Sequence, residues 1–499
     1  MNGQGDSLFI INPGVGLTSK TMELEDFYSR CFLCGRKEPT FNSEARICTC
    51  VHRQGFPESE LPCYVSLLPG LRDYSVRHLP SLWKARPSDV LAVATGDLGL
   101  SQEAIARQIE AVDERCNMRP YQIDLLNTSH HLRCGNSMVY RSSSLEDMTG
   151  SELVLVLDMG TYYWSGTLKD PRSWAILNTA LASHITDLAV WTAGNAGISL
   201  AKLAYFANRR LPPESRLQIH AIVDDDIGPE IRRQLRLWQC EVLDLFRQDK
   251  PVLNPSEIRA LVAARLRCSR RRLEDSSYWH VTDGWDGVGL LMYRLIAAQV
   301  IRDLCGVLND EQAGPLDIVV PVGTGDLLLG FYLGLKDCEE AGVIRYGACR
   351  LVGVLPSGAN ILHNIRQRGI PIPINPGGGL NVSPSAPLMP KLKSLYTPLA
   401  PCLAQIEKEG MTEFVVVTAA DQLRASRQVF SGGIDDGIVA EPSALATFAA
   451  LPYLNNSSRC GNSDNRRVYQ SNRRNLVVNS GLGVLGRAEE DLLHRAMRI

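Results

Sequence analysis

Short apolar runs alternate with longer amphipathic segments along the chain from about residue 150 onward. The apolar runs are rich in β-branched residues and occupy 153–157, 188–192, 217–223, 318–322, 351–355, 414–418 and 476–479. Segments with helical spacing of apolar positions lie between or after them, at 171–184, 195–210, 229–239, 256–268, 288–304, 326–340, 420–430, 443–451 and 488–498. Consecutive apolar residues without strict alternation are typical of parallel strands buried on both faces. The pattern therefore predicts an α/β fold with two lobes, each with a twisted, mostly parallel sheet flanked by helices.

The N-terminal part of the chain lacks this alternation. Residues 1–85 are rich in Gly, Pro and Cys, and a helix is predicted over 101–115 with Ser101 as its N-cap. We therefore expect an irregular extension with a helical part, followed by two lobes. The expected units are the extension at 1–125, a large lobe at 126–161 and 286–499, and a small lobe at 162–285.

Composition and charge narrow the functional classes. The chain has 52 Lys and Arg residues against 54 Asp and Glu residues, a formal charge of −2, which gives no electrostatic basis for binding nucleic acid or an anionic membrane. The first residues have no basic region before an apolar stretch, and no apolar run reaches the length of a membrane span. The 14 cysteines are too dilute for a disulfide scaffold in 499 residues. These features predict a cytoplasmic protein with reduced thiols.

Two loops near predicted helix starts carry candidate chemistry. In 165–171 (SGTLKDP), Lys169 stands at the start of a helix, where the helix dipole disfavours an ammonium and so favours imine formation. Taken alone, Lys169 is better explained as a solvated surface lysine. The loop 192–197 (TAGNAG) follows a strand and opens a helix, so its backbone N–H groups can approach an anion. Asn195 supplies an amide donor, although a turn capped by an asparagine accounts for the pattern at least as well.

Two glycine turns follow apolar strands nearer the C-terminus. Residues 321–326 (PVGTGD) form a strand–glycine loop–helix arrangement that can cradle a phosphate with backbone amides and a hydroxyl. The turn has neither the lysine of a Walker A loop nor the third glycine of GxGxxG, and Asp326 would repel a phosphate unless it points away. In 479–483 (NSGLG), Ser480 would present a neutral hydroxyl from a strand end. Generic glycine turns explain each segment when it is taken alone.

The order and spacing of these segments resemble those of the fold-type II pyridoxal-phosphate (PLP) enzymes, which include threonine synthase, cysteine synthase, threonine dehydratase and diaminopropionate ammonia-lyase. The likeness covers roughly 130–490, and threonine synthase-like members match best. Four segments carry the resemblance. Residues 135–141 (GNSMVYR) resemble the family motif Gly-Asn-Thr-Pro-Leu, and residues 165–170 resemble Gly-Ser-Phe-Lys-Asp. Residues 192–197 resemble Ser-Ser-Gly-Asn-Thr/Ala, and residues 441–444 (EPSA) resemble Glu-Pro-Ser-Ser/Ala. The chain departs from the family pattern at Met138, Leu168, 171–174 and Asp326. The resemblance still implies the cofactor, but these departures leave the identity of the substrate undetermined.

The resemblance implies a role for each candidate residue. Lys169 would bind PLP as an imine and move the α-proton, and Asn195 would hydrogen-bond the oxygen of the cofactor ring. The other implied roles are a clamp for the substrate carboxylate at Thr192, Gly194, Asn195 and Ala196, a phosphate cup at Gly323, Thr324 and Gly325, and a contact of Ser480 with the pyridine nitrogen.

The serine has a mechanistic consequence. It cannot keep the pyridine nitrogen protonated as a carboxylate would, so elimination or replacement at the β-carbon through an aminoacrylate is the expected course. We therefore expect a cytoplasmic, homodimeric, threonine synthase-like lyase that acts on a small amino acid with a leaving group at the β- or γ-carbon. The alternatives are a β-replacement synthase that adds a nucleophile to the aminoacrylate, and an inactive PLP-binding regulator or scaffold with residues 1–125 as its interaction module. The intact Lys169, Asn195 and glycine loop at 323–325 argue against the last alternative.

Four cysteines near the N-terminus raise the question of a zinc site. Cys31 and Cys34 form a CxxCG half-site, but the CxC pair of Cys48 and Cys50 is not a standard partner for a zinc ribbon. Free thiols are therefore the favoured interpretation, and no metal is expected.

Overall fold

The computed structural model describes most of the chain from residue 137 onward and a few short segments before it. The described ranges are 28–31, 37–39, 64–66, 122–124, 137–162, 165–182, 185–209, 211–223, 227–244, 278–281, 287–310, 314–357, 389–392, 399–436, 438–455 and 473–481. The predicted helices at 101–115, 256–268 and 488–498 lie outside these ranges.

A seven-stranded sheet forms the larger part of the structure, with strand order β13-β12-β11-β14-β6-β5-β4. Its strands are β4 (Gln122–Asp124), β5 (Ser137–Arg141), β6 (Leu153–Asp158), β11 (Leu316–Pro321), β12 (Cys349–Pro356), β13 (Thr412–Val417) and β14 (Arg474–Asn479). Neighbouring strands are parallel except β5 and β6, which are antiparallel. All residues of the central strands β11 and β14 are buried, as continuous apolar runs predict for strands covered on both faces.

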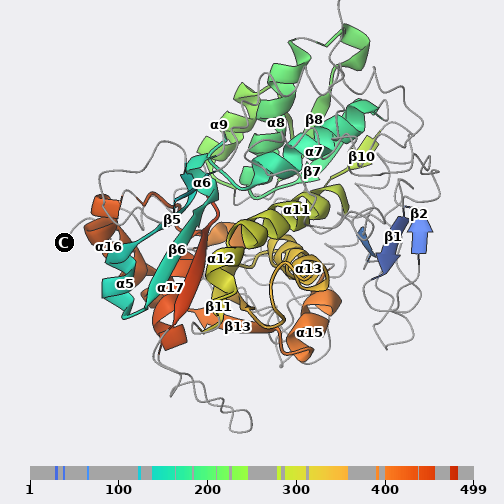
Figure 1. The fold of residues 1–499 in the computed structure, drawn as a ribbon. Coiled ribbons are helices and arrows are strands. Elements are labelled where there is room, and N and C mark those ends of the chain that lie inside the picture. The colour runs from blue at the N-terminus through green and yellow to red at the C-terminus, as the bar shows by residue number, and fades with distance from the viewer. Residues whose placement is uncertain are drawn as a thin grey trace, which may run out of the picture.

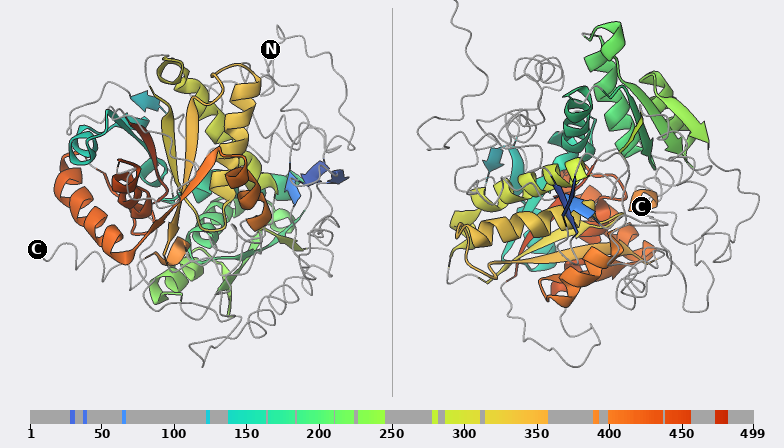
Figure 2. Two further views of the ribbon diagram at one scale, coloured as in Figure 1. Left: turned by 90° about the horizontal axis from the view of Figure 1, so that it is seen from below. Right: turned by 90° about the vertical axis from the view of Figure 1, so that its right-hand side faces the viewer.

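Helices cover both faces of this sheet (Figures 1 and 2). Leu155 and Leu157 of β6 belong to a hydrophobic cluster that includes α11 (Gly287–Asp303), α13 (Asp326–Glu340) and α15 (Ala400–Lys408). Val154 and Val156 belong to the opposite cluster, which includes α5 (Ser143–Thr149), α16 (Ala419–Asp436) and α17 (Leu445–Asn455). Successive side chains of a strand point to opposite faces, and this alternation assigns each group of helices to one face.

Helices α11 and α13 pack at unusually close range. A Cβ atom at Gly330 of α13 would lie 2.5 Å from the Cβ atom of Tyr293, and one at Gly334 would lie 2.7 Å from the carbonyl oxygen of Arg294. The Arg294 guanidinium also donates two hydrogen bonds to Asp337, at 2.5 and 2.6 Å. Only glycine fits at these two positions, so the contact fixes the spacing of the two helices.

A four-stranded, all-parallel sheet forms the second unit, with strand order β10-β7-β8-β9. Its strands are β7 (Asp187–Trp191), β8 (Gln218–Val223), β9 (Glu241–Asp244) and β10 (Tyr278–His280), and its helices are α7 (Lys169–Ala182), α8 (Asn195–Asn208) and α9 (Pro229–Leu237). Helix α7 packs against α8 and also against α11, so it lies where the two units meet (Figure 1).

Shorter elements complete the described chain. They are α6 (Met159–Tyr162), α12 (Cys305–Leu308), the 3-10 turns η3 (Pro213–Ser215) and η4 (Pro390–Leu392), and a three-stranded antiparallel sheet of β1 (Tyr28–Cys31), β2 (Lys37–Pro39) and β3 (Tyr64–Ser66). The stretch expected to be irregular therefore contains a small sheet, and β3 approaches α11. None of the described helices is long and apolar enough to cross a bilayer.

Candidate active site

The candidate loops follow the carboxyl ends of parallel strands. Gly323 lies two residues after the end of β11 and Ser480 directly after β14, and these two strands are parallel neighbours with Ile318 opposite Leu476. Thr192 follows β7 of the smaller sheet. Because parallel strands end at the same edge of their sheet, their loops meet there, and this edge is where α/β folds build their sites.

The backbone around Lys169 is attached to the end of β14. The Leu168 N–H donates to the Ser480 carbonyl at 3.0 Å, and Thr167 forms an isolated antiparallel bridge with Gly481. The Thr167 hydroxyl accepts a hydrogen bond from the Lys169 N–H at 3.2 Å, at the first residue of α7. Ser480 is itself buried. These contacts bring the predicted lysine and the predicted serine together although they lie far apart in the sequence.

The Lys169 side chain extends from this anchored backbone towards an aromatic ring. Its Nζ atom lies 5.7 Å from the ring centroid of Tyr293, a fully buried residue of α11. An ammonium at this distance over a tyrosine ring is attracted by the ring quadrupole.

Asp170 connects the lysine loop to the smaller unit. Its buried carboxylate accepts hydrogen bonds from the Ser165 N–H at 2.7 Å, from the Ser165 hydroxyl, and from the Ser199 hydroxyl of α8 at 2.6 Å. Burial raises the pKa of Asp170 above its ordinary value, and the hydrogen bonds from the two serines oppose this increase. The residue after Lys169 therefore ties α7 to α8.

A threonine hydroxyl closes the turn that precedes α8. Thr192 Oγ1 accepts hydrogen bonds from the N–H groups of Gly194 at 2.9 Å and Gly197 at 3.0 Å. Gly194 has φ +134°, which favours glycine. The Gly194 amide expected at a carboxylate clamp is thus used within the turn, whereas the N–H groups of Asn195 and Ala196 lie in the first turn of α8, where no intrahelical acceptor exists.

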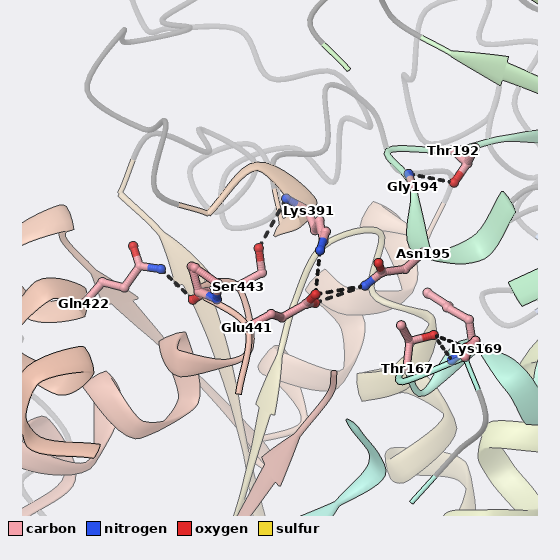
Figure 3. A network of polar contacts seen from close by, with 11 residues as sticks. Thr167, Lys169, Thr192, Gly194, Asn195, Lys391, Gln422, Glu441 and Ser443 are labelled. Carbon is pink, nitrogen blue, oxygen red and sulfur yellow. Dashed lines mark hydrogen bonds and ion pairs between the residues drawn. The ribbon is translucent and has the colours of Figure 1, made fainter. Parts of the chain in front are cut away.

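Asn195 contacts a carboxylate from the larger unit. Its Nδ2 atom donates to the two side-chain oxygens of Glu441, at 3.0 and 3.3 Å. Its Oδ1 atom is buried and has no hydrogen-bond partner among the described residues. Glu441 also accepts a hydrogen bond from Lys391 Nζ at 2.5 Å (Figure 3). A buried acceptor without a donor indicates that a group beyond these protein atoms completes the site.

Gly481 lies against this carboxylate. A Cβ atom at this position would be 3.1 Å from Glu441 Oε1 and 3.4 Å from the Gly166 carbonyl oxygen. The Glu441 N–H donates to the Gly481 carbonyl at 2.8 Å. The lysine loop, the end of β14 and Glu441 therefore converge on one residue.

The glycine turn after β11 borders the same region. Gly325 has φ +100° and precedes α13, and the Thr324 hydroxyl donates to the Asp326 carboxylate. A Cβ atom at Gly323 would lie 3.4 Å from the Lys391 carbonyl oxygen, so the segment 389–392 lies against the turn. The glycine turn is compatible with an anion at the N-terminus of α13, and the hydrogen bond from Thr324 gives the Asp326 carboxylate a partner inside the turn.

The donor set fits a pyridine ring that carries a phosphate and an aldehyde. Lys169 supplies an amine, Asn195 supplies a buried oxygen that can accept a hydrogen bond from a protonated group, and Gly323–Gly325 supply a turn at a helix N-terminus. No group of three or more His, Cys, Asp or Glu side chains in the described part of the chain is arranged to hold a metal. Cys34, Cys48 and Cys50 lie outside the described residues, as does the side chain of Cys31.

Two contributors to the site were not assigned roles from the sequence. Glu441 belongs to the EPSA segment that resembles a family motif, so the motif was a usable signal. Lys391 lies in a short segment, MPKL, which has neither periodicity nor a motif, and only the fold reveals its contact with Glu441.

Comparisons with known proteins agree with this geometry. A sequence model described as "Pyridoxal-phosphate dependent enzyme" matches residues 132–468, well over half of the chain. A search of curated proteins finds no match.

Several solved structures share the fold at low sequence identity. A fungal L-serine ammonia-lyase from Rhizomucor miehei is 16% identical with a TM-score of 0.52, covering 74% of this chain and all 100% of that one. A serine racemase from Dictyostelium discoideum is 13% identical with a TM-score of 0.51, covering 77% and 98%. Maize serine racemase is 13% identical with a TM-score of 0.51, covering 79% and 96%. At such identities the likeness concerns the fold.

Proposed function

Because the chain belongs to the family of pyridoxal-phosphate dependent enzymes, we propose that it catalyses elimination on an amino acid with a leaving group at the β- or γ-carbon, in the manner of a threonine synthase-like lyase. One observation carries the proposal. The backbone of the Lys169 loop is hydrogen-bonded to Ser480 at the end of β14, which supports a common site for the reactive amine and a neutral hydroxyl.

Each residue has a role in this proposal that suits its surroundings. Lys169 joins the cofactor and takes the α-proton of the substrate, and the Tyr293 ring stabilises its ammonium when it carries that proton. The N–H groups of Asn195 and Ala196, at the N-terminus of α8, bind the substrate carboxylate. Thr192 acts through the turn that it closes.

The larger unit supplies the remaining contacts. The turn of Gly323, Thr324 and Gly325, together with the N-terminus of α13, binds the cofactor phosphate. When bound, the cofactor supplies an electron sink for the negative charge at the α-carbon. Ser480 gives the pyridine nitrogen a hydroxyl partner in place of a carboxylate, which supports loss of a leaving group over chemistry that needs full delocalisation into the ring.

The first experiment tests the cofactor attachment. The purified protein should absorb in the near-ultraviolet to visible range, and borohydride reduction followed by peptide mass spectrometry should locate a pyridoxyl group on Lys169. A protein that takes up no added PLP, or that carries the label on another lysine, would contradict the proposal.

A second experiment separates elimination from β-replacement, which uses the same first half of the reaction. Candidate amino acids are supplied with and without a thiol or amine nucleophile, and the shift of the cofactor band and the release of ammonia and keto acid are measured. Keto acid formed without a nucleophile supports elimination, whereas turnover that requires the nucleophile supports the β-replacement synthase. Binding of PLP without turnover of any amino acid would favour a regulator or scaffold.

The arrangement of the two sheets supports a proposal for the two lobes. We infer a small lobe at 162–285, since all four strands of the smaller sheet lie within it, and a large lobe built around the seven-stranded sheet. The homodimeric state and the cytoplasmic location stay predictions, and light scattering of the holoenzyme tests the first of them.

A further inference from the structure

A buried ion pair stands beside the candidate cofactor site. The side chains of Lys391 and Glu441 are only 7% and 3% exposed, and Lys391 Nζ lies 2.5 Å from Glu441 Oε2. Two charges removed from water need a close partner and further hydrogen bonds, and loss of one partner leaves the other charge uncompensated. The pair is therefore expected to behave as a unit.

Both members are held by the backbone around the site. The Lys391 N–H donates to the Ser443 hydroxyl at 3.3 Å, and the Lys391 carbonyl borders Gly323. The Glu441 N–H donates to the Gly481 carbonyl at 2.8 Å. The pair thus spans the space between the glycine turn after β11 and the end of β14.

The carboxylate determines how the Asn195 amide is oriented. A free asparagine amide can rotate by half a turn, which exchanges its donor and its acceptor. An ionised carboxylate only accepts hydrogen bonds, so Glu441 requires the Nδ2 group of Asn195 on its side. The buried Oδ1 atom then has a fixed direction away from Glu441.

The other acidic groups around the site have partners of their own. Asp170 of α7 accepts from Ser165 and from Ser199 of α8, Asp326 of α13 accepts from Thr324, and Asp158 of β6 accepts from Asn479 of β14. Glu441 and Lys391 are the acid and the base that contact Asn195 directly or through each other.

We propose that Glu441 and Lys391 are positioning residues: Glu441 holds the Nδ2 group of Asn195 and so turns its Oδ1 acceptor towards the bound cofactor, where it can accept a hydrogen bond from a protonated group of the cofactor, and Lys391 balances the charge of Glu441. The inference rests on the proposed attachment of PLP to Lys169. It adds two residues with opposite charges, whose effects on the bound cofactor must therefore have opposite signs.

The first test measures the protonation of the cofactor in the holoenzyme. The absorbance band of the bound cofactor changes with pH as the nitrogen joining it to Lys169 gains or loses a proton. Glu441→Gln leaves the Lys391 ammonium uncompensated, so the midpoint of this change should fall by about one pH unit. Lys391→Met leaves the carboxylate uncompensated, and the midpoint should rise by about one pH unit. In the double variant both charges are absent, and the midpoint should lie between those of the single variants.

The second test asks whether Glu441 acts through Asn195. Glu441→Gln should weaken PLP binding to the apoprotein about tenfold when Asn195 is present, and less than about twofold in an Asn195→Ala background. Equal effects of Glu441→Gln in both backgrounds would show that Glu441 does not act through the amide.

Matched controls exclude a general effect of net charge. Glu230 and Arg233 of α9 form an exposed pair at 2.5 Å, and Glu230→Gln and Arg233→Met make the same charge changes away from the site. Neither should move the midpoint. Thermal unfolding of each apoprotein identifies variants that fail to fold. If a single variant fails, the double variant can still be measured, because it loses both charges together and leaves no uncompensated buried charge.

The outcomes separate the inference from the proposed function. Borohydride labelling of Lys169, together with midpoints that stay constant or move in the same direction in both single variants, would overturn the inference and leave the function standing. Absence of the label on Lys169 in the unmodified protein would overturn both.

Discussion

The Nδ2 atom of Asn195 lies 3.0 and 3.3 Å from the two carboxylate oxygens of Glu441, a residue 246 positions away in the chain. Asn195 begins α8 of the smaller unit, whereas Glu441 is fixed to the end of β14 through Gly481. This contact, together with the one between Leu168 and Ser480, joins the two units at the candidate site, and the predictions below test what it and its neighbours do.

Replacement of Lys169 by alanine should lower turnover by at least about a thousandfold, because the amine serves both as the cofactor attachment and as the base. The thermal midpoint of the apoprotein should change little, since only the side chain beyond Cβ is removed. Lys408→Ala, at an exposed position near the end of α15, is the control and should keep full activity. Steady-state rates with any substrate found by spectral screening provide the measurement, and substantial activity in Lys169→Ala would contradict the assigned role.

Gly481→Ala should weaken both folding and cofactor binding. The added methyl group would lie 3.1 Å from Glu441 Oε1 and 3.4 Å from the Gly166 carbonyl, and Glu441 has little freedom to move because Asn195 and Lys391 hold it. We expect a loss of about 1–3 kcal/mol in the free energy of unfolding. Urea unfolding measures it.

Gly306→Ala provides the control for this substitution. Gly306 lies in α12 and a methyl group there meets nothing within 4 Å. Alanine is the better helix former, so the change should stabilise the protein slightly, by up to about 1 kcal/mol. Similar losses of stability in the two variants would show that the crowding at Gly481 is not the cause.

Asp170→Asn should destabilise the protein most at acidic pH, below the ordinary aspartate pKa of 3.8. Burial raises the folded-state pKa of Asp170 above its ordinary value of 3.8, so the folded protein holds this proton more tightly than the unfolded chain. That stabilisation is fully present below pH 3.8 and is lost as the pH rises through the raised pKa. Asparagine cannot titrate, so the cost of the substitution should shrink towards neutral pH.

The size of this effect follows from the hydrogen bonds of Asp170. Loss of acceptors for Ser165 and Ser199 should cost about 1–3 kcal/mol at the acidic end of the series. Guanidinium unfolding of both proteins across the pH range gives the difference, and the exposed substitution Glu230→Gln serves as the reference. A cost that grows with pH would contradict the raised pKa.

The buried thiols should be unreactive in the folded protein. Burial raises the pKa of Cys240 and of Cys338 to about 12, and it raises the pKa of Cys349 further. Almost no thiolate is then present at mildly alkaline pH, and the thiolate is the reactive form. Alkylation followed by mass spectrometry should label these three cysteines only after unfolding, whereas the partly exposed Cys305 should react earlier. Rapid labelling of Cys338 in the folded protein would contradict this assignment.

The sequence predicted those elements whose burial follows from local pattern. The seven strands of continuous apolar residues are present within a few positions of their predicted bounds, and α13 spans 326–340 as predicted. Strand β9 (Glu241–Asp244) was not predicted, because four residues with an acid at each end give no apolar run and pairing with β8 determines it. Helix α15 was missed for a similar reason, since its nine residues follow a proline-rich stretch.

In the candidate site, too, features that follow from local sequence pattern could be predicted, whereas long-range contacts could not. Loops at the ends of apolar strands could be located in advance, since parallel strands bring their carboxyl ends together. The partners within the site could not, because the contacts of Glu441 with Lys391 and Asn195 join segments 50 and 246 positions apart. The hydrogen bond from the Gly194 N–H to the Thr192 hydroxyl could not be predicted either, since a hydroxyl two residues before a glycine is compatible with many types of turn.

The glycines of α13 have a consequence for the length of molecule that the site accepts. Helix α13 starts at the turn after β11, and α11 carries the Tyr293 ring beneath Lys169, so the packing of these helices at Gly330 and Gly334 sets the span from the turn to the amine. The close packing of the two helices therefore limits the distance between the turn and the amine. A methyl group added at Gly330 would meet Tyr293 Cβ at 2.5 Å, so it would push α11 away from α13 and lengthen this span.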